Sequence, residues 1–136
     1  MRLVAGLGCR RDCPADELQG LLLQCLAEAG ASLHELVALA SSEAKAAEPG
    51  LKVLAERLGL SLQLLPVDIL RTYEERLNQP SERVRDATGS PGVAEAAALA
   101  QAEALFGGRA VLLIDKRRGA RATCALACIH HEAERP

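Results

Sequence analysis

Short apolar runs of strand character alternate with helical stretches along the chain, and this alternation constrains the fold more than any other feature of the sequence. The five runs are residues 3–7, 36–40, 60–65, 110–114 and 122–129. Strand–helix–strand order requires crossover connections, which produce a mostly parallel sheet with helices on both faces. The last two runs are too close together for a crossover, so they predict an antiparallel hairpin at an edge of the sheet.

The segments between the runs carry helix start and stop signals. Proline is placed to begin three helices, at Pro14, Pro49 and Pro91, the last with Ser90 as its N-cap. Glycine is placed to end the same helices, at Gly30, Gly59 and Gly107. A short helix is predicted over residues 67–77, and residues 78–89 are expected to be mostly loop. The sequence therefore predicts an α/β fold: one three-layer α/β/α domain over residues 1–136, with a mostly parallel five-stranded sheet and a C-terminal antiparallel edge hairpin.

Composition excludes several classes of protein. The 49% hydrophobic and 25% charged residues are typical of a globular domain, and no apolar run approaches the ~18 residues of a membrane span. A net charge of −2 argues against general nucleic-acid binding, and Tyr73 and Phe106 are the only aromatic residues on which bases could stack. The apolar stretch within residues 1–13 is too short for a secretory signal, so we expect a cytoplasmic protein without disulfide bonds.

Basic side chains cluster where the predicted parallel strands end. In open α/β sheets, ligands bind beyond the carboxyl ends of the strands. Residues 1–13 and 115–121 contain seven basic and two acidic side chains, a net charge of +5, which leaves −7 on the rest of the chain. A basic rim on an acidic body indicates a compact anionic ligand. The alternative is that these are solvated loop charges.

The segment Gly6-Leu7-Gly8-Cys9-Arg10-Arg11 begins like a dinucleotide-binding fingerprint. However, Arg11 stands where the third glycine of that fingerprint belongs. Two arginines at this point instead favour bidentate contact with carboxylates or phosphates. No P-loop motif is present, which argues against nucleotide hydrolysis of that type.

The cysteines do not form a recognisable metal or catalytic motif. The spacing of Cys9 and Cys13 does not suit a zinc site, and His130 and His131 are expected to be exposed tail residues. Cys9 adjoins two arginines and a helix N-terminus, so we expect a lowered pKa for its thiol. Its nearest candidate base, His34, is predicted at the opposite edge of the sheet. The remaining three are expected to be small buried hydrophobic residues: Cys25, Cys124 and Cys128.

Two glutamates are the candidates for acid–base chemistry near the strand ends. Glu48 lies at a predicted helix start and Glu95 in the first turn of the helix that follows Ser90. Both positions are also favoured for carboxylates by the helix dipole, so a structural role is an equally direct explanation.

Four motifs in a fixed order resemble a known family. They are Gly6 to Arg11, Lys45-Ala46-Ala47-Glu48-Pro49-Gly50-Leu51, Val84…Gly89…Val93-Ala94-Glu95-Ala96-Ala97, and Lys116 ahead of Thr123-Cys124-Ala125-Leu126-Ala127. Together they resemble the cobalamin-biosynthesis family of CobE and the CbiG C-terminal domain, over nearly the whole chain. Asp12 and Ala47 depart from the family pattern, which has a small or neutral residue and an acidic residue at these positions.

The resemblance implies that the ligand is a corrin-pathway intermediate, a flat apolar macrocycle that carries several acetate and propionate carboxylates. It implies no cofactor and no metal. The ligand-binding residues would include carboxylate-binding side chains and backbone groups at the strand ends and helix starts: Gly8, Cys9, Arg10, Arg11, Lys45, Glu48, Ser90, Gly92, Glu95 and Lys116.

The resemblance leaves three roles open. A carrier or accessory factor is favoured, because the longer CbiG proteins have further N-terminal sequence ahead of the matching region. The alternative is a hydrolase that opens the lactone of a precorrin-5A-type intermediate and releases acetaldehyde. In that enzyme Lys45 or Arg10 would stabilise an oxyanion and Glu48 or Glu95 would activate water. A third possibility is a non-catalytic subunit whose edge hairpin docks on another enzyme of the pathway.

Overall fold

The computed structural model describes residues 2–77 and 92–129. The first half contains β1 (Leu3–Cys9), α1 (Ala15–Ala29), the 3-10 turn η1 (Leu33–Glu35), β2 (Leu36–Ser42), the 3-10 turn η2 (Glu43–Lys45) and α2 (Pro49–Leu58). The second half contains β3 (Leu62–Leu65), α3 (Val67–Leu77), α4 (Val93–Phe106), β4 (Ala110–Arg118) and β5 (Ala122–Ile129). No helix of the described ranges is long and apolar enough to cross a membrane.

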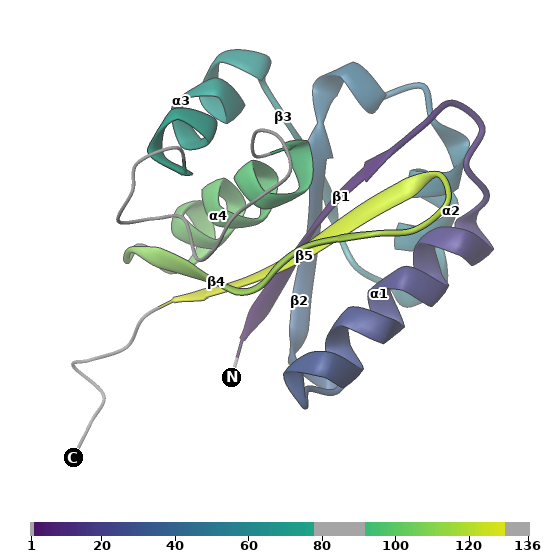
Figure 1. Cartoon of the computed structure of the whole chain (residues 1–136), viewed down its shortest axis with the longest axis horizontal. Helices are drawn as coiled ribbons and strands as arrows, with labels where there is room; N and C mark the ends of the chain where they lie inside the picture. Colours follow the sequence, from purple (N-terminus) through teal and green to yellow (C-terminus); the bar gives the residue numbers. More distant parts are fainter. Residues whose placement is uncertain (1, 78–91, 130–136) are drawn as a thin grey trace.

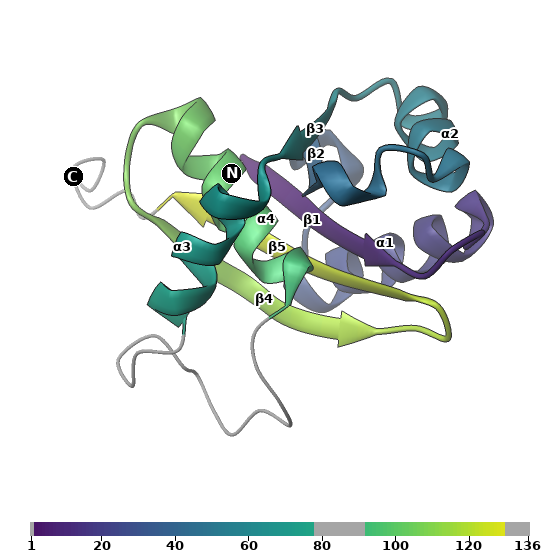
Figure 2. The same cartoon turned by 90° about the horizontal axis from the view of Figure 1, so that it is seen from above.

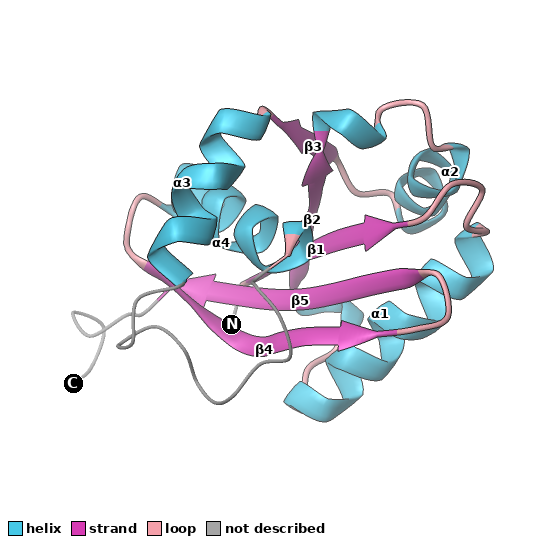
Figure 3. Cartoon of the chain, turned by 45° about the horizontal axis from the view of Figure 1, so that its top comes forward, coloured by secondary structure: helices cyan, strands magenta, loops and turns pink. Residues whose placement is uncertain are grey.

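The five strands form one sheet in the order β3-β2-β1-β5-β4. β1, β2 and β3 are parallel, β5 is antiparallel to β1, and β4 is antiparallel to β5. β4 therefore runs in the same direction as β1 and forms an edge of the sheet. Figure 3 shows the β4–β5 turn at the same end of the sheet as the end of β1. The predicted mostly parallel sheet with an antiparallel edge hairpin is confirmed.

Helices cover both faces of the sheet, as predicted. α1 and α2 lie on one side of the strands, and α3 and α4 lie on the other (Figure 1). Side chains alternate between the two cores along β5: Cys124, Leu126 and Cys128 join the core under α1, whereas Ala127 and Ile129 join the core under α4. Cys25 lies in the α1 core as well. The three cysteines expected to act as small buried hydrophobic residues are buried.

α4 lies unusually close to β1 because both surfaces have small residues where they meet. A Cβ atom at Gly6 would lie 1.9 Å from the carbonyl oxygen of Ala94 and 2.7 Å from the backbone nitrogen of Ala98. The outer side of α4 is covered by α3, which lies beside it (Figure 2). Leu70 and Leu77 of α3 belong to the same core as the alanines of α4. An alanine-rich helix fits here because it is enclosed on both sides.

Polar contacts fix α3 against the end of α4. Glu103 accepts hydrogen bonds from Tyr73 Oη at 2.8 Å, from Arg76 at 3.0 Å and from the backbone N–H of Ala110 at 2.8 Å. Burial raises the pKa of Glu103, but these three donors outweigh it, and the pKa lies below its ordinary value. The carboxylate thus joins α3, α4 and the start of β4.

Helix boundaries agree with the predicted signals except at two starts. Pro49 begins α2, and Gly30, Gly59 and Gly107 end their helices in the left-handed conformation. Pro14 is the N-cap of α1 rather than its first residue. α4 begins at Val93, two residues after the predicted start at Pro91, because Gly92 is still extended and serves as its N-cap. Ser90, the predicted N-cap, lies outside the described residues.

The fourth strand is longer than predicted. β4 continues to Arg118, where the sequence had indicated a turn from Lys116 onward. The extension follows from pairing with β5, since Arg117 pairs with Cys124 and Arg118 with Thr123. Residues 115–118 are therefore strand residues with defined faces.

Replacing Gly6 with alanine should destabilise the protein, because the new methyl group would overlap the Ala94 carbonyl and force α4 away from β1. Overpacking of this kind costs about 1–3 kcal/mol. Urea denaturation followed by circular dichroism should show a lower midpoint for Gly6→Ala. The matched control is Gly20→Ala on α1, where a Cβ meets nothing within 4 Å and should add about 0.5–1 kcal/mol of stability. Equal midpoints for both variants and the parent would contradict the close approach of α4.

Candidate functional site

A pocket of about 280 Å³ opens at the carboxyl end of β1. Its lining comes from four places in the sequence: the end of β1 with Gly8, Cys9 and Arg10, then Lys45 of η2, Val93 of α4, and residues 118–123 of the β4–β5 hairpin. The strand ends thus converge where the topology of an open α/β sheet predicts a ligand site.

Pairing between β1 and β5 places the hairpin turn over the end of β1. Gly8 pairs with Thr123 and Cys9 with Ala122, and the backbone N–H of Arg10 donates to the carbonyl of Arg121 at 2.8 Å. A Cβ atom at Gly8 would lie 2.6 Å from Thr123 Oγ1, so glycine makes room for the threonine side chain. The turn is consequently part of the pocket wall, although its residues are also exposed to solvent.

Glu17 of α1 fixes the same turn from outside the pocket. Its carboxylate accepts a hydrogen bond from the backbone N–H of Arg121 and forms an ion pair with Arg121 Nε at 3.0 Å. The turn is therefore attached to β1 on one side and to α1 on the other.

The pocket contains three cationic side chains without a carboxylate partner in the part of the chain that the structure describes. Arg10 and Arg118 are exposed at its rim, and Lys45 is half-buried in its wall. Arg121, the fourth cation of the lining, is paired with Glu17. The arrangement favours a ligand that carries more than one negative charge.

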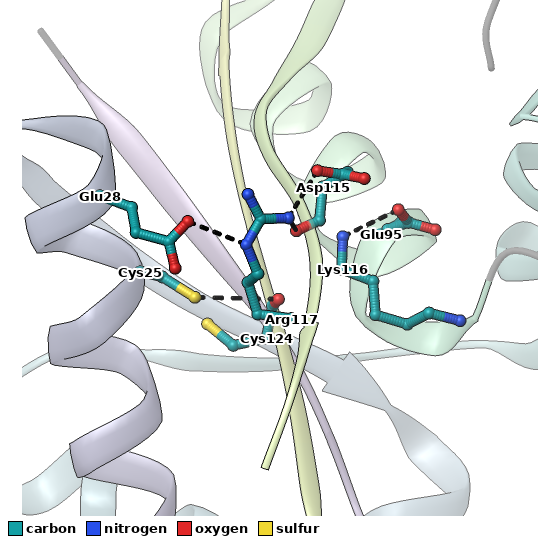
Figure 4. A network of polar contacts seen from close by, with 7 residues as sticks. All are labelled: Cys25, Glu28, Glu95, Asp115, Lys116, Arg117 and Cys124. Carbon is teal, nitrogen blue, oxygen red and sulfur yellow. Dashed lines mark hydrogen bonds and ion pairs between the residues drawn. The ribbon is translucent and has the colours of Figure 1, made fainter. Parts of the chain in front are cut away.

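An irregularity in β4 decides which basic residue reaches the pocket. Ile114 packs in the α1 core, and the pairing of β4 with β5 shifts register between Ile114 and Arg117. Arg117 therefore points to the α1 face, where it pairs with Glu28 at 2.9 Å and Asp115 at 2.7 Å (Figure 4). These two carboxylates raise the pKa of Arg117. The next residue, Arg118, lines the pocket.

Cys9 lies in the pocket wall, 9% exposed, and the expectation of a lowered pKa is wrong. Burial raises the pKa of the Cys9 thiol, and the nearby Glu48 carboxylate raises it further. The Lys45 ammonium acts in the opposite direction but does not outweigh them. Desolvation exceeds the effect of the adjoining arginines because the thiol faces inward while Arg10 and Arg11 are exposed. Cys9 is a neutral thiol at neutral pH.

Glu48 supports the loop after β1 and does not line the pocket. Its Oε1 accepts the backbone N–H of Asp12 at 2.8 Å. Asp12 has a φ of 63°, a left-handed conformation that aspartate adopts more readily than most residues. Arg11, which precedes it, is exposed and lies outside the pocket lining. The predicted acid–base role of Glu48 thus competes with a structural hydrogen bond.

Gly92, Glu95 and Lys116 form a separate group next to the pocket. Glu95 Oε2 accepts the backbone N–H of Lys116 at 2.9 Å (Figure 4), and a Cβ at Gly92 would lie 3.6 Å from Lys116 Nζ. None of the three lines the pocket, although Val93 beside them does. Glu95, like Glu48, binds a backbone amide.

Sequence reasoning placed Gly8, Cys9, Arg10 and Lys45 together correctly, and their role in binding stays a prediction. It missed Val93 and residues 118–123 as lining residues. The basic run of 115–121 was a signal for them, but it did not indicate which strand of the hairpin lies beside β1. Among the described residues, no three His, Cys, Asp or Glu side chains gather to hold a metal ion, and His130 and His131 lie outside them.

The fold and the pocket define a small α/β protein with a basic cavity at the carboxyl ends of its strands. A family model described as "Cobalamin synthesis G C-terminus" matches residues 3–127. The chain belongs to this cobalamin-biosynthesis family.

Individual relatives agree with this assignment. The chain is 41% identical over 125 residues to "Protein CobE" of Sinorhizobium sp, an alignment covering 92% of this chain and 79% of that protein. It is similar to a crystal structure of CobE, described as a protein from the cobalamin (vitamin B12) biosynthetic pathway, with a TM-score of 0.82 and 50% identity over 95% and 91% of the two chains. It is also 30% identical over 130 residues to a cobalt-precorrin-5A hydrolase of Priestia megaterium. That alignment covers 96% of this chain but only 33% of the longer protein.

The environment of Cys9 predicts slow alkylation at neutral pH. Because the pKa of its thiol lies above the ordinary value of 9.0, the rate of reaction with iodoacetamide should still be rising at pH 9. Peptide mapping by mass spectrometry across pH 6–10 measures this rate, with a short cysteine peptide as reference and circular dichroism to confirm folding. A rate for Cys9 that reaches its plateau near pH 7 would show an activated thiolate and contradict the assignment.

Proposed function

We propose that the protein binds a polycarboxylate intermediate of corrin-ring biosynthesis at the strand-end pocket and acts as a cytoplasmic carrier or accessory factor of the pathway. The observation that carries this proposal is a set of three cations around one cavity, Arg10, Lys45 and Arg118, which have no carboxylate partner among the described residues. A protein with a net charge of −2 has these basic side chains together here, at the carboxyl ends of the parallel strands, where open α/β sheets bind ligands.

The cations match the chemistry of such a ligand. Corrin intermediates carry acetate and propionate arms, and guanidinium groups form strong charge-assisted hydrogen bonds with carboxylates. Three side chains from three different elements can each meet a different carboxylate oxygen. The family supports the same ligand class, since its model is described as "Cobalamin synthesis G C-terminus" and one relative is named cobalt-precorrin-5A hydrolase.

The apolar part of the lining suits a flat ring. Val93, Ala120 and Ala122 present small apolar surfaces to the pocket. The pocket lining contains no aromatic side chain, so the ring would be held by its carboxylates and by apolar contact instead of stacking.

Hydrolysis of a lactone is the alternative function, suggested by the precorrin-5A hydrolase relative. It requires a carboxylate that activates water near the pocket. Glu48 and Glu95, the two candidates, each accept a backbone N–H, and neither lines the pocket. Binding without turnover is therefore the better explanation of the site. Docking of the β4 edge on another enzyme of the pathway is compatible with either function.

A first experiment separates binding from conversion. The purified protein is passed through gel filtration with a mixture of corrin-pathway polycarboxylates, and the spectrum and mass of the co-eluting pigment are recorded. An unaltered pigment that travels with the protein supports the carrier function. A pigment whose mass shows lactone opening and loss of a two-carbon fragment supports the hydrolase. Absence of any co-eluting or altered pigment contradicts both.

Arg10→Ala should weaken binding of the co-eluting pigment about 10- to 100-fold, because a hydrogen bond to a charged group contributes about 1.5–3 kcal/mol. Arg11→Ala is the matched control, since Arg11 is adjacent, equally charged and exposed outside the pocket. Absorbance titration measures both affinities, and thermal denaturation confirms that both variants fold. Equal affinities for the two variants would remove Arg10 from the site.

A further inference from the structure

The pocket is too small for a complete corrin macrocycle. Its volume is about 280 Å³. Pockets that enclose whole drug-sized ligands measure about 300–1,000 Å³. A macrocycle built from four pyrrole-derived rings with up to eight acidic arms is larger than a typical drug. Only part of such a ligand can enter.

The charges within this volume match one corner of the macrocycle. Each pyrrole-derived ring carries at most two acidic arms, and the cavity offers Arg10, Lys45 and Arg118 within one small space. These three come from the end of β1, from η2 and from the end of β4, so they surround the cavity from different directions. A pair of carboxylates on one ring would find a cation for each of them.

The walls of the cavity favour a narrow, flat edge over a broad face. Thr123 Oγ1 occupies the space beside Gly8, and Val93 provides one apolar wall. The turn that forms the opposite wall is attached to both β1 and α1, through Arg10 N–H to Arg121 O and through Arg121 to Glu17. A wall fixed at both ends does not open readily to admit the full width of a macrocycle.

We propose that the pocket recognises a single pyrrole-derived ring with its acetate and propionate arms, and that the macrocycle is bound edge-on by this corner. This inference rests on the proposed function. In this pose the remaining rings stay outside the pocket. A second protein can bind these exposed rings before the bound ring dissociates from the pocket. Recognition by one corner also explains how one protein could accept several successive intermediates that differ elsewhere on the ring.

A monopyrrole that carries one acetate and one propionate arm, porphobilinogen, isolates this corner. In ¹H–¹⁵N NMR titrations it should shift the amides of Gly8, Arg10 and residues 119–123, and it should displace the bound pigment in competition. Its dimethyl ester, which lacks both charges, should do neither. Arg118→Ala should weaken monopyrrole binding about tenfold, whereas Arg71→Ala, an equal loss of charge on an exposed position of α3, should not.

Failure of this inference can be told apart from failure of the proposed function. If the pigment binds in an Arg10-dependent manner but the monopyrrole neither shifts these amides nor competes, edge-on binding is overturned. The carrier function is then left intact. Absence of pigment binding overturns both. Collisional quenching gives an independent measure: acrylamide should quench the fluorescence of bound metal-free pigment nearly as efficiently as that of free pigment. Strong protection of the bound pigment would show an enclosed ring and contradict the inference.

Discussion

The antiparallel pairing of β1 with β5 is the interaction on which the rest of the molecule depends. All seven residues of β1, from Leu3 opposite Cys128 to Cys9 opposite Ala122, pair with β5. The pairing joins the parallel half of the sheet to the hairpin, and it carries the β4–β5 turn to the carboxyl end of β1. The same ladder of hydrogen bonds therefore builds the core and one wall of the pocket.

Small residues allow the two helical layers to approach this central pair. Gly6 admits the backbone of α4, and the alanines of α4 let α3 cover it from outside. A chain with only two aromatic residues has to fill its core with leucine, alanine and cysteine, which explains why all five cysteines are buried. Cys9 is one of these buried cysteines. It packs in the core under α1, and the resulting desolvation raises the pKa of its thiol. Its position in the pocket therefore does not make it a nucleophile.

Much of this architecture could be predicted from the sequence, because apolar runs, helix-starting prolines and helix-ending glycines are local signals. The convergence of Gly8, Cys9, Arg10 and Lys45 followed from the general geometry of strand ends. The rest depended on long-range facts. The order of β4 and β5 in the sheet is set by the pairing of β1 with β5, two strands far apart in the sequence. The register shift between Ile114 and Arg117 reverses the faces of the basic residues that follow, so simple alternation could not distinguish the structural Arg117 from the pocket-lining Arg118.

This division of the basic residues has a consequence for the site. Arg117 and Arg121 are paired with carboxylates that face them from α1, so they stabilise the hairpin and their charge is largely neutralised. Arg10, Lys45 and Arg118 remain to attract an anion. Two of these three are exposed, where solvent and salt weaken electrostatic attraction. Moderate attraction at an open pocket is consistent with the proposed carrier function, because a buried cationic cavity that enclosed a polycarboxylate would release it slowly.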